Sequence, residues 1–171
     1  MFRRAPVTIA LAAGLLTACL SSRPAAKAPV AYSAQALRSN ATVSVKEFRG
    51  DPVLLTSWAT WCSECRAEMP RIESFWRAHM HDGLHVVAVN LDGAGPGSRN
   101  IEAEIRDWGL TMPVWRDQGN QFNQVFGGLG VPISVLLDSN GKVVHTWQGA
   151  IDPSDKAFTR IVDPVLQTSG S

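Results

Sequence analysis

Two cysteines, Cys62 and Cys65, are the residues whose type and spacing most directly suggest chemistry. They follow an apolar, β-branched run at 53–58 and open a segment with helical spacing. A C-x-x-C pair between a strand and a helix is typical of a redox site. The start of a helix favours a thiolate, because unpaired N–H groups and the positive end of the dipole lie there. We therefore expect Cys62 to attack a target disulfide and Cys65, one turn later, to release the product.

The segments that must position this pair alternate between strands and helices. Strands are predicted at 53–58, 84–90, 133–137 and 142–147, and helices at 62–81, 98–108, 121–126 and from 152 onward. The first half alternates as a parallel βαβ unit does, and Asn140-Gly141 between apolar runs predicts a hairpin. Asp152 is the expected N-cap of the last helix, with Pro153 as its first residue. The pattern predicts an α/β fold with a mixed sheet.

The first residues have the features of a bacterial export signal. Arg3 and Arg4 precede a short apolar run, and 16–19 reads Leu-Thr-Ala-Cys. This ending resembles a bacterial lipoprotein box, which implies removal of 1–18 and lipid attached to Cys19. The alternative is a plain secretory signal in which Cys19 is incidental. Lipidation of Cys19 would also account for the third cysteine, because it leaves Cys62 and Cys65 as a single pair in the exported chain.

A change of composition follows this signal. Residues 19–40 are rich in Ser, Ala and Pro and predict a flexible tether that begins with the lipidated Cys19. Several acyl chains anchor a protein stably to a membrane. We therefore expect a folded domain over 41–171, held in the bacterial periplasmic space by a lipid anchor.

Other uses of Cys62 and Cys65 have to be weighed against a redox pair. A disulfide that closes so short a loop removes little entropy from the unfolded chain. Structural zinc usually has four ligands, and His79 and His81 lie roughly 25 Å from Cys62 along the predicted helix. Two reduced core thiols are uncommon in exported proteins. A Cu(I) carrier stays open as an alternative, because thiolates suit that ion.

Length and charge exclude several classes of protein. The 171 residues suffice for one domain with a core, and 16 Lys and Arg stand against 15 Asp and Glu. Such a balance offers no basic excess for nucleic acid, and no apolar run suits a multi-span membrane protein. We expect a monomer that needs no metal and no cofactor besides its own disulfide.

Two motifs resemble signatures of the TlpA/ResA/DsbE-type thioredoxin-like proteins. The first is Trp58-Ala-Thr-Trp-Cys-x-x-Cys-x-x-Glu-x-Pro70, and the second is Gly130-Val-Pro followed by an apolar strand and Asp138-x-x-Gly141. The resemblance runs from about residue 43 to 166. It implies a thioredoxin fold with a mixed central sheet and helices on both faces. It also implies export, membrane tethering and disulfide exchange, often the reduction of apocytochrome c or another exported thiol protein.

The resemblance assigns roles to matching positions. Cys62 would be the attacking thiol and Cys65 the resolving one. Pro132 would be cis and lie against the disulfide, where the backbone of Val131 is offered to an extended substrate. Apart from the resemblance, we expect Trp61 to shape and shield the substrate-binding site rather than to bind a cofactor. Without the resemblance, Pro132 would be an ordinary trans residue at a strand start.

Glu68 has two interpretations. In the ResA-like branch the matching Glu tunes the two thiols, and a half-buried carboxylate here could exchange protons with Cys65. The alternative is a surface Glu paired with Arg71 or Arg66. Thioredoxin places a buried Asp where this chain has Thr56, which favours Glu68 as the proton acceptor.

Two departures from the family pattern bear on the activity. Ser57 replaces a large apolar residue, so we expect looser packing under the site. Glu64 lies between the cysteines where Pro is common, and its charge opposes thiol ionisation. A strong oxidant needs a very stable thiolate. We therefore expect a protein that reduces its substrates and receives its electrons from a membrane-embedded thiol reductant. An oxidase or isomerase is the alternative.

Overall fold

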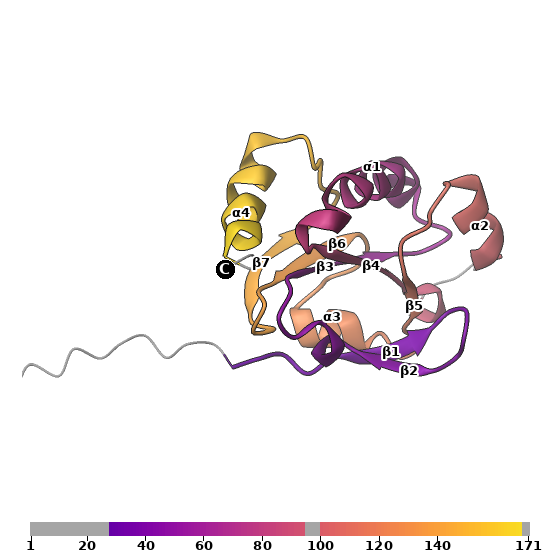
Figure 1. Cartoon of the computed structure of the whole chain (residues 1–171). Helices are drawn as coiled ribbons and strands as arrows, with labels where there is room; N and C mark the ends of the chain where they lie inside the picture. The colour runs from indigo at the N-terminus through magenta and orange to yellow at the C-terminus, as the bar shows by residue number, and fades with distance from the viewer. Residues whose placement is uncertain (1–27, 95–99, 169–171) are drawn as a thin grey trace, which may run out of the picture.

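The computed structural model describes residues 28–94 and 100–168, whose centre is a mixed sheet (Figure 1). The strand order is β2-β1-β5-β4-β3-β6-β7. The strands are β1 (Ser33–Ala36), β2 (Thr42–Ser44), β3 (Val53–Trp58), β4 (His85–Asn90), β5 (Val114–Arg116), β6 (Ile133–Leu137) and β7 (Val143–Gln148). β4 is parallel to β3 and β5, and the other neighbours are antiparallel. The expected mixed α/β sheet is confirmed.

Helices cover both faces of this sheet. The α-helices are α1 (Ser63–His79), α2 (Ile101–Asp107), α3 (Gln121–Phe126) and α4 (Lys156–Gln167), and the 3-10 helices are η1 (Val45–Phe48), η2 (Met80–Asp82) and η3 (Asp92–Ala94). In Figure 1, α1, α2 and α4 lie on one side of the sheet and α3 on the other. Each side has its own apolar cluster: Ile72 and Phe158 belong to one, and Phe122 to the other.

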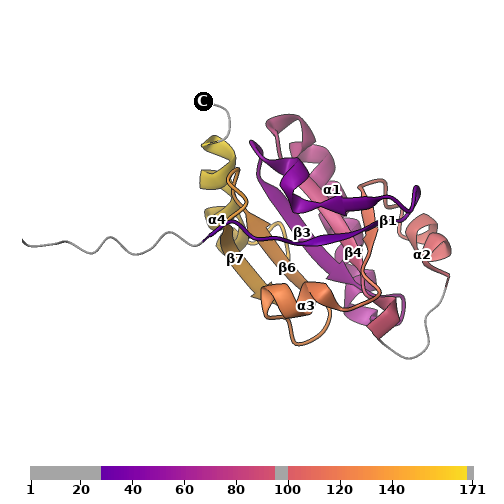
Figure 2. The ribbon, with the colours of Figure 1, turned by 90° about the horizontal axis from the view of Figure 1, so that it is seen from below.

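The central strands β3 and β6 are buried along their whole length. Figure 2 shows β6, β3 and β4 side by side in the sheet. Because apolar clusters cover both faces, these strands carry continuous apolar runs rather than an alternating pattern. The runs at 53–58 and 133–137 therefore predict β3 and β6 with the bounds that the structure has.

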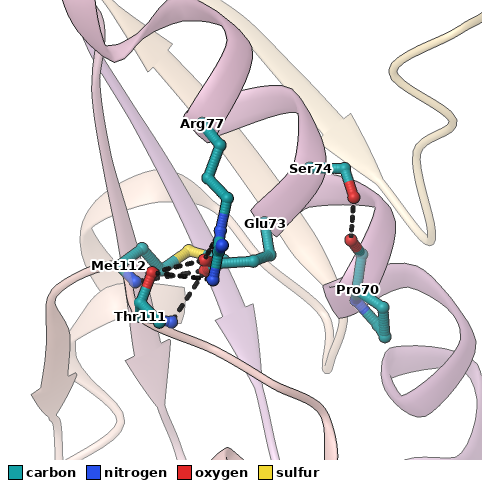
Figure 3. Close-up of polar contacts among 6 residues, drawn as sticks. All are labelled: Pro70, Glu73, Ser74, Arg77, Thr111 and Met112. Atoms are coloured by element: carbon teal, nitrogen blue, oxygen red, sulfur yellow. Dashed lines mark hydrogen bonds and ion pairs between the residues drawn. The ribbon is translucent and has the colours of Figure 1, made fainter.

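Glu73 fastens α1 to the loop before β5 (Figure 3). Its carboxylate accepts hydrogen bonds from the backbone N–H groups of Thr111 (2.9 Å) and Met112 (3.1 Å). The Thr111 hydroxyl (2.5 Å) and Arg77 Nε (2.7 Å) also donate to it. Several donors inside the protein replace the water that a carboxylate loses on burial. Glu73 therefore holds α1 against the connection between α2 and β5.

The predicted tether is wrong in its last part. Residues 33–36 form β1, which pairs antiparallel with both β2 and β5. Tyr32 is 2% exposed, packs against Phe122 and donates its hydroxyl to Asp117 (3.2 Å). The folded part therefore begins before residue 41, and the polar composition concealed it because β1 is a short strand with alternate residues exposed.

The predicted signal and lipid site, residues 1–18 and Cys19, lie outside the described residues. Among the residues that are described, no helix has the length and apolar character needed to cross a bilayer.

The last helix begins later than predicted. Its N-cap is Asp155, whose carboxylate accepts a hydrogen bond from the N–H of Ala157 (2.8 Å), and the helix starts at Lys156. Asp152 instead accepts bonds from the backbone N–H (2.9 Å) and hydroxyl (2.7 Å) of Ser154. Asp152 thus forms a local turn, so its prediction as N-cap is wrong.

Candidate active site

A disulfide joins Cys62 and Cys65 at the start of α1. Cys62 is the N-cap of the helix, and its Sγ accepts a hydrogen bond from the backbone N–H of Cys65 (3.1 Å). Cys62 is 7% exposed, whereas Cys65 is fully buried. The helix start stabilises negative charge on the outer sulfur, and that sulfur is the one that a second molecule can reach.

The loop that precedes Cys62 is held by Asp92, the first residue of η3 and two residues beyond β4. The backbone N–H and the hydroxyl of Thr60 both donate to Asp92 Oδ1, at 2.7 and 3.1 Å. β3 and β4 are parallel, so both strands lead to the same edge of the sheet. Sequence reasoning missed Asp92, although its position directly after a buried strand is the signal that could have found it.

A hollow of about 190 Å³ opens beside the disulfide. It is lined by Thr60, Trp61, Cys62, Ser63 and Arg66. The Trp61 side chain is 42% exposed, so a large apolar surface borders the outer sulfur. Trp61 therefore lies beside Cys62, and its part in substrate binding stays a prediction.

Arg66 forms the charged wall of this hollow. Its guanidinium pairs with Glu104 (3.1 Å) and lies 5.6 Å from the ring centre of Trp108. The partner of Arg66 is therefore on α2 and not Glu68.

The peptide bond between Val131 and Pro132 is cis, as the family resemblance implies. The backbone N–H of Gly149 donates to the Pro132 carbonyl (2.9 Å). Val131 is partly buried and packs against the apolar clusters of both faces.

Ser57 contacts the residue that follows this proline. Its Oγ accepts a hydrogen bond from the Ile133 N–H (2.9 Å) and donates to the Ile133 carbonyl (3.2 Å). Ser57 is fully buried. The hydroxyl makes two specific contacts there, and looser packing under the site stays a prediction.

Glu68 lies in the core rather than at the surface. It is fully buried, and Oε1 accepts a hydrogen bond from the backbone N–H of Ile151 (2.7 Å). Burial raises the pKa of Glu68 to about 7, opposed by the Ile151 bond and by the charge of Arg71 and reinforced by Glu64. Arg71 itself pairs with Asp152 (3.0 Å). The alternative of a surface Glu68 paired with Arg71 or Arg66 is wrong, and the carboxyl is buried more deeply than expected.

A neutral hydroxyl pair occupies the position where thioredoxin has a buried Asp. The Ser134 hydroxyl donates to the Thr56 hydroxyl (3.0 Å), and both residues are fully buried. This pair supplies no carboxyl, so Glu68 stays the predicted proton acceptor.

Metal-ligating side chains are dispersed over the part of the chain that the structure describes. Within it, no three or more His, Cys, Asp or Glu residues lie close enough to hold a metal ion. His79 is bonded to Asp82 (3.0 Å) through Nδ1.

A disulfide at a helix start, a cis proline before the neighbouring strand and a mixed sheet covered on both faces define a thioredoxin-like fold with a redox site. Residues 23–161 match the Redoxin family, so the chain belongs to that family. The sequence prediction of a thioredoxin-like fold is confirmed.

Named relatives agree with this assignment. The chain is 32% identical over 109 residues to the thiol-disulfide oxidoreductase ResA of Geobacillus thermodenitrificans, a match that covers 64% of this chain and 61% of that protein. It is 30% identical over 101 residues to the sporulation thiol-disulfide oxidoreductase A of Bacillus subtilis, a match that covers 59% of this chain and 61% of that protein. The match thus spans about three fifths of the length of these curated relatives.

Solved structures share the fold over most of the chain. A candidate thiol:disulfide interchange protein DsbE from Chlorobium tepidum superposes with a TM-score of 0.69 at 27% identity, covering 82% of this chain and 96% of that one. StoA from Bacillus subtilis superposes with a TM-score of 0.64 at 24% identity, covering 78% of this chain and 97% of that one.

Proposed function

We propose that this protein is an exported, lipid-anchored thiol–disulfide oxidoreductase that acts mainly as a reductant of extracytoplasmic proteins. The observation that carries the proposal is the disulfide at the start of α1, whose outer sulfur, on Cys62, borders the hollow beside Trp61. The relatives named as thiol-disulfide oxidoreductases support the same activity.

The reaction begins from the reduced pair. The Cys62 thiolate attacks one sulfur of the substrate disulfide, forming a mixed disulfide and releasing the first substrate thiolate. The Cys65 thiolate then attacks the Cys62 sulfur, closing the intramolecular disulfide and releasing the second substrate thiolate. Two electrons pass to the substrate, and the two protons of the cysteine thiols end on the product thiols. The protein's own disulfide serves as the redox group, so no separate cofactor takes part.

Glu68 is proposed to take up the proton of Cys65. It lies three residues further along the same helix, and its pKa of about 7 lets it both accept and return a proton near neutral pH. Carboxylates at Glu64 and Glu68 oppose thiolate formation, and a less stable thiolate makes the reduced pair a better electron donor.

The substrate is proposed to be an exported protein that presents its disulfide in an extended segment. The backbone of Val131 before the cis Pro132 would pair with that segment, and Trp61 would cover its side chains. Apocytochrome c is the candidate that the family resemblance supplies. A membrane-embedded thiol reductant would return the Cys62–Cys65 pair to the dithiol.

Insulin reduction driven by dithiothreitol tests the activity. We expect the wild-type protein to accelerate it and Cys62→Ser to abolish the effect. Reduced Cys65→Ser, mixed with insulin after dithiothreitol has been removed, should accumulate a mixed disulfide on a non-reducing gel, because no second thiol of the protein then resolves it. A reduced protein that binds Cu(I) stoichiometrically and exchanges no disulfide would replace the enzyme by the carrier alternative. The reduction potential of the pair decides between reductant and oxidase.

Anchoring is tested separately. Radiolabelled palmitate should enter the wild-type protein in a bacterial host and not the Cys19→Ser variant. Label in neither protein would leave a plain secretory signal as the better interpretation.

A further inference from the structure

Ser57 occupies the place where the ladder between β3 and β6 stops. The two strands pair from Val53↔Leu137 to Thr56↔Ser134, and no backbone pair follows at Ser57. At that point the Ser57 hydroxyl contacts both the N–H (2.9 Å) and the carbonyl (3.2 Å) of Ile133. The side chain thus adds two contacts to Ile133 at the point where the ladder ends.

A hydroxyl suits this place because it can accept and donate at once. The N–H and carbonyl of Ile133 face β3 in the interior, where an unpaired polar group is costly. Alanine, or an apolar residue of any size, would leave both without this partner. A serine here is therefore a specific solution for the backbone that leaves the cis proline.

The proline is tied from the other neighbouring strand as well. The N–H of Gly149, directly after β7, donates to the Pro132 carbonyl (2.9 Å). Ser57 and Gly149 thus fix the backbone on the C-terminal side of Pro132 from opposite sides. Val131, on the N-terminal side, takes its orientation from a proline whose position these contacts set.

We propose that Ser57 is a positioning residue for substrate docking, which it serves by holding Ile133, and through it Pro132 and Val131, in place. The inference rests on the proposed function, because it assumes that Val131 pairs with the backbone of a protein substrate. The hydrogen bonds of the Ser57 hydroxyl go to Ile133 and not to a cysteine sulfur. Its loss should therefore impair binding of a protein disulfide and spare the reaction of Cys62 with a small one.

Two probes separate these effects: insulin as the protein disulfide and 5,5′-dithiobis(2-nitrobenzoic acid) as the small one. For Ser57→Ala we expect the KM for insulin to rise about tenfold, with the rate constant for the small disulfide within about twofold of wild type. Ser134→Ala is the matched control, since it removes another buried hydroxyl, one that bonds the Thr56 side chain and not Ile133. It should leave both measurements unchanged.

Ser57→Thr separates docking from stability. It keeps the hydroxyl and adds a methyl group to a packed interior, so it should lower the melting temperature yet retain the wild-type KM for insulin. Equal losses on both probes in Ser57→Ala, or a raised KM in Ser57→Thr, would overturn the positioning role. A wild-type protein inactive on both probes would instead refute the proposed function.

Discussion

Two carboxylates on α1, Glu68 and Glu73, are about equally hidden from solvent, yet burial has opposite outcomes for them. Glu68 is 0% exposed and Glu73 is 4% exposed. Burial raises the pKa of Glu68 to about 7. Burial also acts to raise the pKa of Glu73, but hydrogen bonds from Thr111, Arg77 and Met112 outweigh it and hold the pKa below its usual value.

The difference lies in the number of donors that each carboxylate meets. Glu73 accepts bonds from two backbone N–H groups, a hydroxyl and an arginine (Figure 3). For Glu68 the structure gives one donor, the N–H of Ile151. A carboxylate with many donors stays charged and anchors the fold, whereas one with few is poised to exchange a proton. Exposure to solvent alone does not decide between these roles.

Removing the Glu73 carboxylate should have the largest effect on stability. Glu73→Ala leaves the N–H groups of Thr111 and Met112 without their acceptor, so we expect the free energy of unfolding to fall by about 4 kcal/mol at neutral pH. Urea denaturation measures it. Ser74→Ala is the control: its hydroxyl bonds only the Pro70 carbonyl in the same helix, and the change should stay within about 0.5 kcal/mol. A loss below 1 kcal/mol for Glu73→Ala would remove its anchoring role.

The pH dependence of stability should separate the two residues by sign. Below pH about 4.5 Glu68 is protonated in both the native and unfolded states. As pH rises toward 7 the unfolded chain ionises first, so the native state loses stability relative to it. The free energy of unfolding of Glu68→Gln, relative to that of wild type, should therefore rise by about 3 kcal/mol from pH 4 to pH 8.

Denaturation at several pH values checks this prediction, and Glu73→Gln provides the contrast. The pKa of Glu73 is lowered, so its contribution is present above pH about 4.5 and is lost as pH falls through the folded-state value. If the free energy of unfolding of Glu68→Gln followed pH in parallel with that of wild type, Glu68 would have an ordinary pKa.

The smallest effect should come from Arg77, the exposed member of the Glu73 cluster. Its side chain is 55% exposed, so Arg77→Gln should cost less than about 1 kcal/mol, and the difference from wild type should shrink in added salt. The backbone donors of Thr111 and Met112 remain in place. A loss as large as that of Glu73→Ala would mean that the ion pair, and not the backbone bonds, makes Glu73 an anchor.

The elements predicted with correct bounds are two uniformly buried strands and a short helix that turns Phe122 and Phe126 into the core. β3, β6 and α3 have the predicted bounds, and the hairpin turns at Gly141, which has a φ of 68°. β1, β2 and β5 were missed because each has only three or four residues. Such short strands are specified by the neighbours they pair with more than by their own sequence.

The site divides in a similar way. Cys62, Cys65 and Pro132 stand in local motifs, and the structure shows the disulfide and the cis peptide bond that these motifs imply. The contacts of Ser57 with Ile133 and of Glu68 with Ile151 join residues 76 and 83 positions apart. No local pattern announces such long-range partners, so the roles of those side chains could be read only from the folded chain.

The early start of the fold limits how far the protein can stand from a bilayer. The N–H of Val30 already bonds the carbonyl of Gly141 (2.8 Å), two residues before the buried Tyr32. With a lipid on Cys19, as proposed, the chain from anchor to Val30 reaches at most about 40 Å even when fully stretched. A leash of that length keeps the folded domain near the lipid headgroups, so electron donors and clients must meet it there.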